Sequence, residues 1–362
     1  MKDLKVALVH EWLISWGGSE SVLLSLSRLF PDAPIFTSVY APDSRVRRVF
    51  AECDIQPGVL QLVPGVQRLY RGLLPLMPWA FKRMNLKDFD LVISSSHAFA
   101  KAVSVAPDAY HLCYCHTPPR YLWDLYDSYN PGLQGVLGGP LLKYLKRKDF
   151  QVAKNVSGFI ANSAYVADRI ARSYGRSATV VYPPVDVDQF DVVAVQGSYY
   201  LAGGRMVKYK RLDKAIEAAN RGKFRLIVFG DGPERARLTR LAGPTVEFTG
   251  EVTQPELAEL IHHSRAFLFP GVEDFGILPV EVQAGGRPVI ALAQGGALET
   301  VKAGVTGLLY EDDSVDGLLD AVHRFEPNAF NPMECRLNAL RFSRDRFEKE
   351  MAEIIRQVSG RT

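Results

Sequence analysis

The chain has 362 residues, with 43 lysines and arginines against 40 aspartates and glutamates, and 47% of its residues are hydrophobic. This length exceeds one ordinary hydrophobic core and fits two α/β domains. The composition is that of a globular protein, and no apolar run reaches the eighteen or so residues of a membrane-spanning helix. The first residues run directly into a strand pattern and lack the apolar core and cleavage site of a signal peptide.

Charge is distributed unevenly along the chain. Residues 1–190 contain 21 Lys and Arg and 16 Asp and Glu, a net charge of +5, whereas the remainder contains 22 and 24, a net charge of −2. A basic N-terminal half favours an anionic partner such as a membrane surface. No nucleic-acid recognition motif accompanies it, so we expect no nucleic-acid partner. The four cysteines lack the spacing of zinc or redox motifs and are expected to be reduced thiols.

The first half of the chain alternates between strand and helix patterns. Lys5–His10 is a short apolar run that predicts a buried parallel strand, and Ser19 is the predicted N-cap of a helix that continues to Phe30. Further strands are predicted at Pro34–Val39, Leu91–Ser94, His111–Cys115, Gly158–Ala161 and Thr179–Tyr182, and helices at Leu141–Ala153 and Tyr165–Tyr174. This alternation predicts a doubly wound parallel sheet.

The same alternation restarts after a break. Pro183 and Pro184 cannot continue a central strand, and residues up to 198 show no clear periodicity. New strands are predicted at Tyr199–Ala202, Arg225–Phe229, Val246–Thr249, Ala266–Phe269, Pro288–Ala291 and Gly307–Tyr310, followed by helices over 333–344 and 346–359. We therefore predict an N-terminal acceptor-binding domain over 1–185, a donor-binding domain over 196–340, and a C-terminal helix within 341–362 that packs back on the first domain.

One segment of the N-terminal half combines basic and large apolar side chains. Val66–Lys87 contains Arg68, Arg71, Lys82, Arg83 and Lys87 among leucines, methionines, a tryptophan and a phenylalanine. Such a mixture favours contact with a membrane interface. The alternative is a pair of packed helices interrupted at Pro75 and Pro78.

The strongest chemical signal lies after the strand that ends at Phe269. Pro270-Gly271 turns the chain into a glycine-containing loop, and a helix is predicted to begin near Leu278. The free amides of a helix N-terminus at the carboxyl end of a parallel strand form an anion site. Glu273 and Glu281 flank this site, and a carboxylate can accept hydrogen bonds from both vicinal hydroxyls of a ribose.

This segment resembles the Glu-x7-Glu motif of the retaining glycosyltransferase family 4, including its Phe-Gly-Ile/Leu-x-Pro-x-Glu core. The resemblance runs over nearly the whole chain. It implies the α/β GT-B fold, with two Rossmann-like doubly wound domains, a cleft between them and a C-terminal helix that crosses back. It also implies that Glu273 holds the donor sugar and that Glu281 holds the ribose. The donor would further be bound by Phe275, Gly276, Ile277 and Leu278.

Other positions match the same family. Gly17-Gly18-x-Glu20 resembles the first glycine-rich loop, and Gly204, Arg205 and Lys210 resemble the family's diphosphate clamp. His116 matches the histidine beside the donor sugar. Gly295-Gly296-x-x-Glu299 matches a later loop, although Ala297-Leu298 departs from its usual residues. The resemblance thus implies catalytic roles for His116, Arg205, Lys210 and Glu273, donor contacts by Gly17, Gly18 and Gly204, and acceptor contacts by Glu20 and Arg120.

The segment His-Thr-Pro-Pro-Arg-Tyr-Leu-Trp-Asp after Cys115, together with His10-Glu11-Trp12-Leu13, resembles a bacterial branch that makes O-antigen and exopolysaccharide. We therefore expect transfer of mannose from GDP-mannose to a glycan or polyprenyl-linked acceptor, in the cytoplasm at the inner face of the cell membrane. Two fixed cations, and the lack of an Asp-x-Asp motif near the loop that would bind the donor, predict a reaction that needs no metal or other cofactor.

Three alternatives remain open. A UDP-sugar is the alternative to GDP-mannose as donor. A sugar-nucleotide epimerase of the same architecture would release free sugar, and a non-catalytic module would bind without turnover. A nicotinamide dehydrogenase would need Gly-x-Gly-x-x-Gly after the first strand, where this chain has only Gly17-Gly18.

Overall fold

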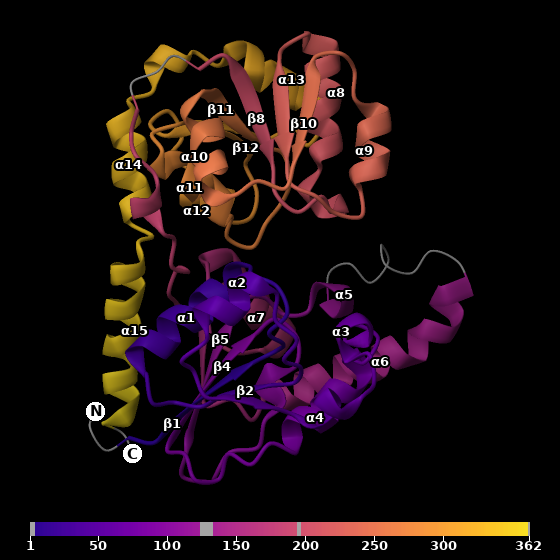
Figure 1. Cartoon of the computed structure of the whole chain (residues 1–362), viewed down its shortest axis with the longest axis vertical. Coiled ribbons are helices and arrows are strands. Elements are labelled where there is room, and N and C mark those ends of the chain that lie inside the picture. Colours follow the sequence, from indigo (N-terminus) through magenta and orange to yellow (C-terminus); the bar gives the residue numbers. More distant parts are fainter. Residues whose placement is uncertain (1–3, 124–132, 194–196, 361–362) are drawn as a thin grey trace. The chain divides into compact units, whose positions relative to one another are not determined.

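The computed structural model describes residues 4–123, 133–193 and 197–360. The chain forms two compact units, one of Met1–Pro184 with Phe347–Thr362 and one of Val185–Arg346 (Figure 1). Each is built on a parallel sheet with helices on both faces, so the predicted pair of Rossmann-like domains is confirmed. Within the described residues, no helix is both long and apolar enough to cross a bilayer.

The N-terminal unit contains a sheet in the order β3-β2-β1-β4-β5-β6-β7. Its strands are β1 (Val6–His10), β2 (Ile35–Thr37), β3 (Ile55–Pro57), β4 (Leu91–Ser96), β5 (Tyr110–Cys115), β6 (Gly158–Ala161) and β7 (Thr179–Val180). Its helices are α1 (Gly18–Leu29), α2 (Ser44–Val49), α3 (Val66–Leu69), α4 (Met77–Lys82), α5 (Arg120–Trp123), α6 (Leu133–Ala153) and α7 (Ala164–Tyr174), and most of α15 (Arg344–Ser359) joins them.

The packing of strand β1 explains why Val6–Val9 are all apolar. Val6 and Leu8 pack under α1 and α15, whereas Ala7 and Val9 pack under α4 and α6 on the other face. Successive side chains of a strand point to opposite faces, so a strand covered on both sides needs a continuous apolar run. Phe347, Met351 and Ile355 of α15 belong to the core under α1, and Figure 1 shows α15 running along this unit.

The second unit repeats the architecture with the sheet order β10-β9-β8-β11-β12-β13. Its strands are β8 (Tyr199–Gly203), β9 (Leu226–Phe229), β10 (Val246–Gly250), β11 (Ser264–Phe269), β12 (Val289–Leu292) and β13 (Gly307–Tyr310). Helices α8 (Leu212–Gly222) and α13 (Val315–Arg324) share one core with these strands. The remaining helices are α9 (Arg235–Leu241), α10 (Gln254–His262), α11 (Ile277–Ala284), α12 (Ala297–Thr300) and α14 (Pro332–Leu340), of which α10 and α11 contact β11.

Three local predictions differ from the structure. The N-cap of α1 is Gly17 rather than Ser19, whose hydroxyl donates to the adjacent Glu20 carboxylate. The short edge strand β3 was not predicted, because it carries no apolar run. Helix α6 begins at Leu133, before the predicted Leu141, and continues through Pro140.

Candidate active site

Two loops of the second unit leave the sheet at the point where its strand order reverses. Strands β8 and β11 are neighbours there, and the chain continues from β8 into Gly204-Arg205 and from β11 into Pro270–Glu273. Doubly wound sheets bind their ligands at the carboxyl ends of strands at such a switch point. The fold therefore brings together two sequence motifs, whose Lys210 and Glu273 lie 63 residues apart in the chain.

A glycine allows these loops to touch. A Cβ atom on Gly271 would lie 2.5 Å from the Tyr209 carbonyl oxygen and 2.6 Å from the Lys210 Cα. Real Cβ atoms do not approach backbone so closely, so only glycine lets the loop after β11 lie against the short 3₁₀ turn η5 (Lys208–Lys210). As a result, the Lys210 Nζ lies 2.6 Å from the Glu273 Oε1.

The Lys210–Glu273 ion pair is largely removed from solvent, with the Lys210 side chain 13% exposed. Burial alone would lower the pKa of Lys210, but the charge of Glu273 and the hydrogen bond to it raise that pKa above its ordinary value, and the charge of Glu281 adds to the effect. Lys210 is therefore a fixed cation. Its Nζ lies 3.3 Å from where a Cβ on Gly204 would stand, which places the ammonium over that backbone.

The start of helix α11 offers uncapped amides beside this ion pair. Gly276 is the N-cap, with a φ of 89°, and it has no side chain to bond the first-turn N–H groups. A Cβ there would also lie 3.2 Å from the Phe269 ring, so the position requires glycine on two grounds. The amides of Ile277 and Leu278 therefore begin the helix without a side-chain cap, as an anion site requires.

A buried amide network that the sequence did not reveal fixes α11. The Gln283 Nε2 donates to the Pro279 carbonyl at 3.0 Å and to the Thr300 carbonyl at 2.9 Å. The Asn338 Nδ2 donates to the Gln283 Oε1 at 2.6 Å, which ties α11 to α14. The Gly296 N–H donates to the Glu273 carbonyl at 2.9 Å. The Gly295-Gly296 motif therefore fixes the backbone of the loop that carries Glu273.

The remaining predicted residues of this unit lie near the same edge of the sheet. Arg205 follows Gly204 and is exposed, and its guanidinium makes no ion pair with any residue that the structure describes. Glu281 is half-buried in the second turn of α11. Phe275 is buried, with its ring centroid 5.3 Å from that of Phe342.

The other predicted site residues belong to the N-terminal unit, at its own switch point between β1 and β4. His10, the last residue of β1, is paired with Ser95 of β4, and His116 follows β5 directly. The Ser95 Oγ lies 2.8 Å from the His116 Nε2 and 3.1 Å from the His10 Nδ1. The His10 Nε2 lies 3.3 Å from the Glu20 Oε1. These distances form a continuous hydrogen-bonded chain from α1 to His116.

His116 is a neutral side chain in this network. Burial lowers its pKa well below the ordinary value, and the nearby His97 and His10 lower it further. Glu20 is only 4% exposed and is engaged by His10 and Ser19, so its carboxylate faces inward. Its position favours a role in holding His10, and an acceptor contact by Glu20 stays a prediction.

The glycines and the arginine predicted in this unit lie on short elements. Gly17 caps α1 and Gly18 begins it. Arg120 begins α5 and is half-buried. Between His116 and α5, the buried Arg169 holds the chain by donating to the Thr117 hydroxyl and the Pro118 carbonyl.

Glu11, which follows His10, occupies a nest of amides. Its Oε1 accepts from the N–H groups of His97, Ala98 and Ala100, and its Oε2 accepts from that of Phe99. The Ser96 hydroxyl donates to the Oε1 as well. Burial would raise the pKa of this fully enclosed carboxyl, but nearby His97 and the amide hydrogen bonds lower it. Glu11 therefore organises the loop after β4 as an ionised side chain.

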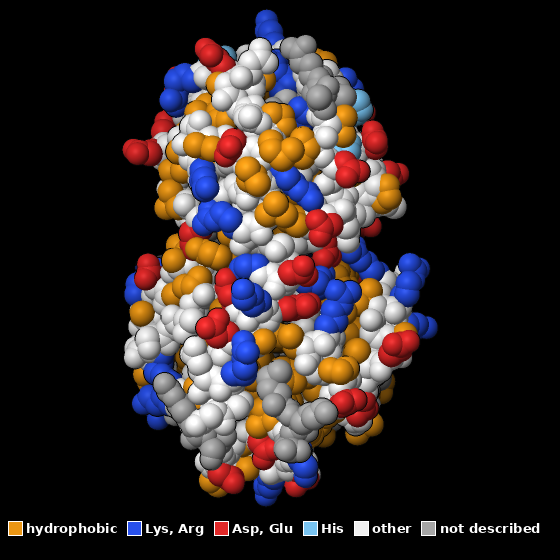
Figure 2. All heavy atoms as spheres, turned by 90° about the vertical axis from the view of Figure 1, so that its left-hand side faces the viewer, with side chains coloured by type: hydrophobic (Ala, Val, Ile, Leu, Met, Phe, Trp, Pro, Cys, Tyr) orange, Lys and Arg blue, Asp and Glu red, His pale blue; other side chains and the backbone are white. Residues whose placement is uncertain are grey.

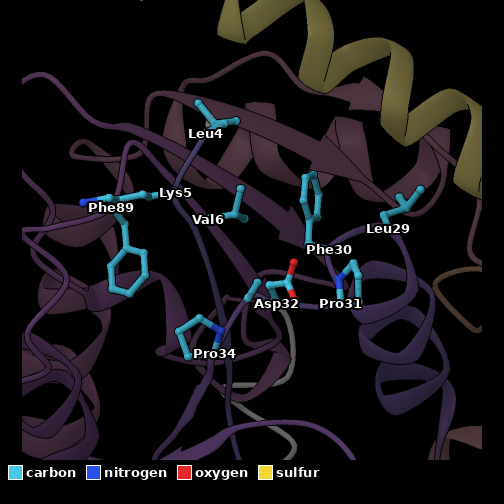
Figure 3. A pocket seen from close by; sticks show the side chains of 10 residues that line it. Leu4, Lys5, Val6, Leu29, Phe30, Pro31, Asp32, Pro34 and Phe89 are labelled. Atoms are coloured by element: carbon cyan, nitrogen blue, oxygen red, sulfur yellow. The ribbon is translucent and has the colours of Figure 1, made fainter. Parts of the chain in front are cut away.

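A separate hollow of about 570 Å³ lies at the amino-terminal edge of the same sheet. Figure 3 shows Phe30, Asp32, Pro34 and Phe89 among the side chains around it. This edge is opposite the carboxyl ends of the strands, where doubly wound sheets bind ligands, so the hollow is not part of the candidate site. Among the described residues, no group of three or more His, Cys, Asp and Glu side chains is arranged to hold a metal.

Comparison with known proteins decides the family. The family described as "Glycosyltransferase Family 4" matches residues 16–189, and the family described as "Glycosyl transferases group 1" matches residues 192–340. D-inositol 3-phosphate glycosyltransferase of Kribbella flavida is 31% identical over 84% of this chain and 81% of its own. The chain belongs to glycosyltransferase family 4.

Two mannosyltransferases match over part of their length. GDP-mannose-dependent alpha-(1-6)-phosphatidylinositol monomannoside mannosyltransferase of Mycobacterium tuberculosis is 34% identical over 44% of this chain. The matched region spans about half of that relative, 50% of its length. A GDP-mannose-dependent alpha-mannosyltransferase of the same organism is 36% identical over 33% of each chain.

Solved structures show the same fold. Sucrose-phosphate synthase of Thermosynechococcus elongatus superposes with a TM-score of 0.74 at 17% identity, covering 98% of this family 4 chain and 100% of its own. Anabaena Alr3699/HepE, solved in complex with UDP and glucose, gives a TM-score of 0.71 at 18% identity, covering 97% and 99%. The predicted GT-B fold is thus confirmed.

Proposed function

We propose that the protein is a retaining mannosyltransferase that uses GDP-mannose as donor and a lipid-linked or glycan hydroxyl as acceptor. The observation that carries this proposal is the buried Lys210–Glu273 ion pair beside the uncapped start of α11. A nucleotide sugar presents a diphosphate to such cations and amides, and sugar hydroxyls to the carboxylate. The donor is taken from the GDP-mannose-dependent relatives.

The proposed chemistry occurs on one face of the sugar. The bond between the anomeric carbon and the diphosphate oxygen breaks with both electrons leaving on the diphosphate. The acceptor oxygen then bonds to the anomeric carbon from the same side, and its proton passes to the departing diphosphate oxygen. Arg205 and Lys210 stabilise the charge that develops on the leaving group, and we propose that these cations suffice without a metal.

A panel of GDP- and UDP-sugars, each tested for a shift in thermal unfolding, identifies the donor. We expect GDP-mannose to stabilise the protein by about 2.7 kcal/mol at a concentration one hundred times its Kd. Addition of membrane extract should then convert the donor to a mannosylated product. Stabilisation by a UDP-sugar alone would identify that sugar, and not GDP-mannose, as the donor. Release of free sugar would indicate an epimerase, and binding without turnover would indicate a non-catalytic module.

The variant Glu281→Ala tests the ribose contact within the same assay. Loss of a charge-assisted hydrogen bond of about 1.5–3 kcal/mol should weaken donor binding roughly 10- to 100-fold. Glu326→Ala is the matched control, because Glu326 is an exposed glutamate of the same unit that follows α13 and belongs to neither of the loops after β8 and β11. An unchanged donor affinity in Glu281→Ala, with only kcat reduced, would contradict the assigned role.

We further propose that the acceptor lies in an anionic membrane to which the N-terminal unit binds. The chain has no acidic residue between Asp54 and Asp88, and all five basic residues of Val66–Lys87 are exposed. Large apolar side chains are exposed within this segment and just before it, with Trp79 52% and Leu62 84% exposed. The Arg83 guanidinium lies 5.2 Å from the Trp79 ring centroid. Apolar insertion and attraction to anionic headgroups would act together on such a surface.

Flotation with vesicles that contain anionic lipid tests this surface. Each basic residue near such a membrane contributes about 1 kcal/mol, so Lys82→Ser/Arg83→Ser should weaken binding roughly 30-fold. Helix α15 supplies the control, because its Arg344–Ser359 sequence mixes both charges, and Figure 2 shows basic and acidic side chains together on that face. Equal losses in Lys349→Ser/Arg356→Ser would show that only net charge matters and would contradict the assigned surface.

A further inference from the structure

Helix α14 of the second unit carries apolar side chains on two opposite faces. Cys335 and Ala339 are buried on one of them, and the helix packs against α11. Met333, Leu337 and Leu340 follow one another at spacings of four and three residues, so they form an outer stripe on the other side, where they are 53%, 51% and 40% exposed. Figure 2 shows hydrophobic side chains gathered where α14 lies in this unit. A surface helix ordinarily needs one apolar face, so the outer stripe indicates a further partner.

Two exposed charges of opposite sign lie along one side of the outer stripe. Glu334 and Arg341 directly follow the first and last residues of the stripe, so both belong to the same flank of the helix. Arg341 is the C-cap residue and keeps helical backbone angles, and its Nη1 donates to the Asn338 Oδ1 at 2.8 Å. Within the described part of the chain, neither charge belongs to an ion pair. The two residues are roughly 10.5 Å apart along the helix axis, too far to pair with each other.

We propose that the outer stripe is a contact between two copies of this chain, in which α14 pairs antiparallel with α14 of the second copy about a two-fold axis near Leu337. Such an axis places the same flank of both helices on the same side of the contact and reverses their direction. Glu334 of each copy then lies opposite Arg341 of the other, offset by only about 1.5 Å along the helix axis. The charges of one copy therefore complement those of an identical copy, whereas a parallel pair would keep them apart.

The size of this contact sets the strength of the association. Helix α14 has 9 residues and is about 13.5 Å long, so one pair of such helices buries less than the roughly 1,600 Å² of a standard interface. We therefore expect a weak dimer, with a Kd on the order of 100 µM and an oligomeric state that depends on protein concentration. This inference involves neither the donor nor the acceptor, so it stands apart from the proposed function.

Sedimentation equilibrium between about 5 and 500 µM protein measures the association directly. We expect the mass to rise from the 40.3 kDa of one chain toward twice that value. Leu337→Glu sets two carboxylates against each other at the two-fold axis and should leave the folded protein monomeric throughout. Leu141→Glu, the same change at a leucine of α6 that is 44% exposed, is the matched control and should dimerise like wild type. A wild-type protein that stays monomeric at the highest concentration, or a Leu337→Glu variant that dimerises normally, would overturn the proposal.

Exchange of the two flanking charges tests the antiparallel geometry. Glu334→Arg or Arg341→Glu alone sets like charges opposite each other on both sides of the two-fold axis, so each should weaken dimerisation roughly tenfold. The double variant Glu334→Arg/Arg341→Glu restores both attractions, and its Kd should return to within about twofold of the wild-type value. A double variant that dimerises as weakly as either single variant would overturn the antiparallel pairing, even where the wild-type protein forms a dimer.

Discussion

Replacement of Lys210 with alanine is expected to lower kcat roughly 10²- to 10³-fold, the loss that follows removal of one charge-stabilising group. The reason is that Lys210 is a buried ammonium whose raised pKa keeps it charged, beside the amides where a diphosphate would bind. Charge that develops on a leaving diphosphate gains more from such a fixed cation than the ground-state donor does. The loss should therefore fall on kcat more than on donor affinity.

Lys208→Ala is the matched control, because Lys208 is an exposed cation on the same 3₁₀ turn η5. Both rates should be measured at saturating donor, and thermal unfolding should confirm that each variant is folded. We expect Lys208→Ala to retain turnover within a few-fold. Wild-type turnover in Lys210→Ala, or an equal loss in both variants, would show that the ammonium beside Glu273 does not act on the leaving group.

The donor loop could be predicted because its parts are contiguous in the sequence. Strand β11, the turn at Gly271, Glu273 and the start of α11 follow one another within a few residues, so a single motif describes them. Sequence also indicated that Arg205 and Lys210 would lie near this loop, through the family resemblance. It did not indicate the close approach of Gly271 to Lys210, because that contact depends on the pairing of β8 with β11.

The histidine network illustrates what sequence patterns leave out. His10 and Ser95 lie 85 residues apart, and only the parallel register of β1 with β4 places them opposite each other. Neither residue belongs to a recognisable spacing. A polar residue at the last position of a buried strand was the available signal, because burial of an unpaired polar group is costly and implies a partner. The same signal was present at Glu11, directly after β1.

Secondary structure was predictable where the strands are buried on both faces, and less so at the edges. Strand β3 has only three residues and stands at the edge of the described sheet, where it pairs with β2. Helix α6 includes glycines and Pro140, which individually disfavour a helix interior. Its Leu145 packs with the core of α4, so tertiary packing outweighs the local propensity. The prediction of Ser19 as the N-cap of α1 was wrong: the cap is Gly17, and the Ser19 hydroxyl donates to the Glu20 carboxylate.

Glu11→Gln is expected to destabilise the N-terminal unit by about 3–5 kcal/mol, the range for removal of one charge from a buried paired set. The glutamine keeps the shape, but its NH₂ group replaces one carboxylate oxygen. An amide donor such as the Phe99 N–H, which bonds to that oxygen in the wild type, then faces another donor. All four tryptophans, at positions 12, 16, 79 and 123, lie in this unit, so their fluorescence during urea unfolding reports on it. Glu52→Gln, the same change at an exposed position of the unit, should cost less than about 0.5 kcal/mol.

The free energy of unfolding differs between wild type and Glu11→Gln, and the pH dependence of this difference identifies its electrostatic part. The folded-state pKa of Glu11 is lowered, so its contribution to stability is fully present above the unfolded glutamate pKa of about 4.3 and is lost as the pH falls from there toward the folded-state pKa. The difference between wild type and Glu11→Gln should therefore be constant near neutral pH and shrink below about pH 4.3. A difference under about 1 kcal/mol at neutral pH, or one that grows on acidification, would mean that the amides around Glu11 do not depend on its charge.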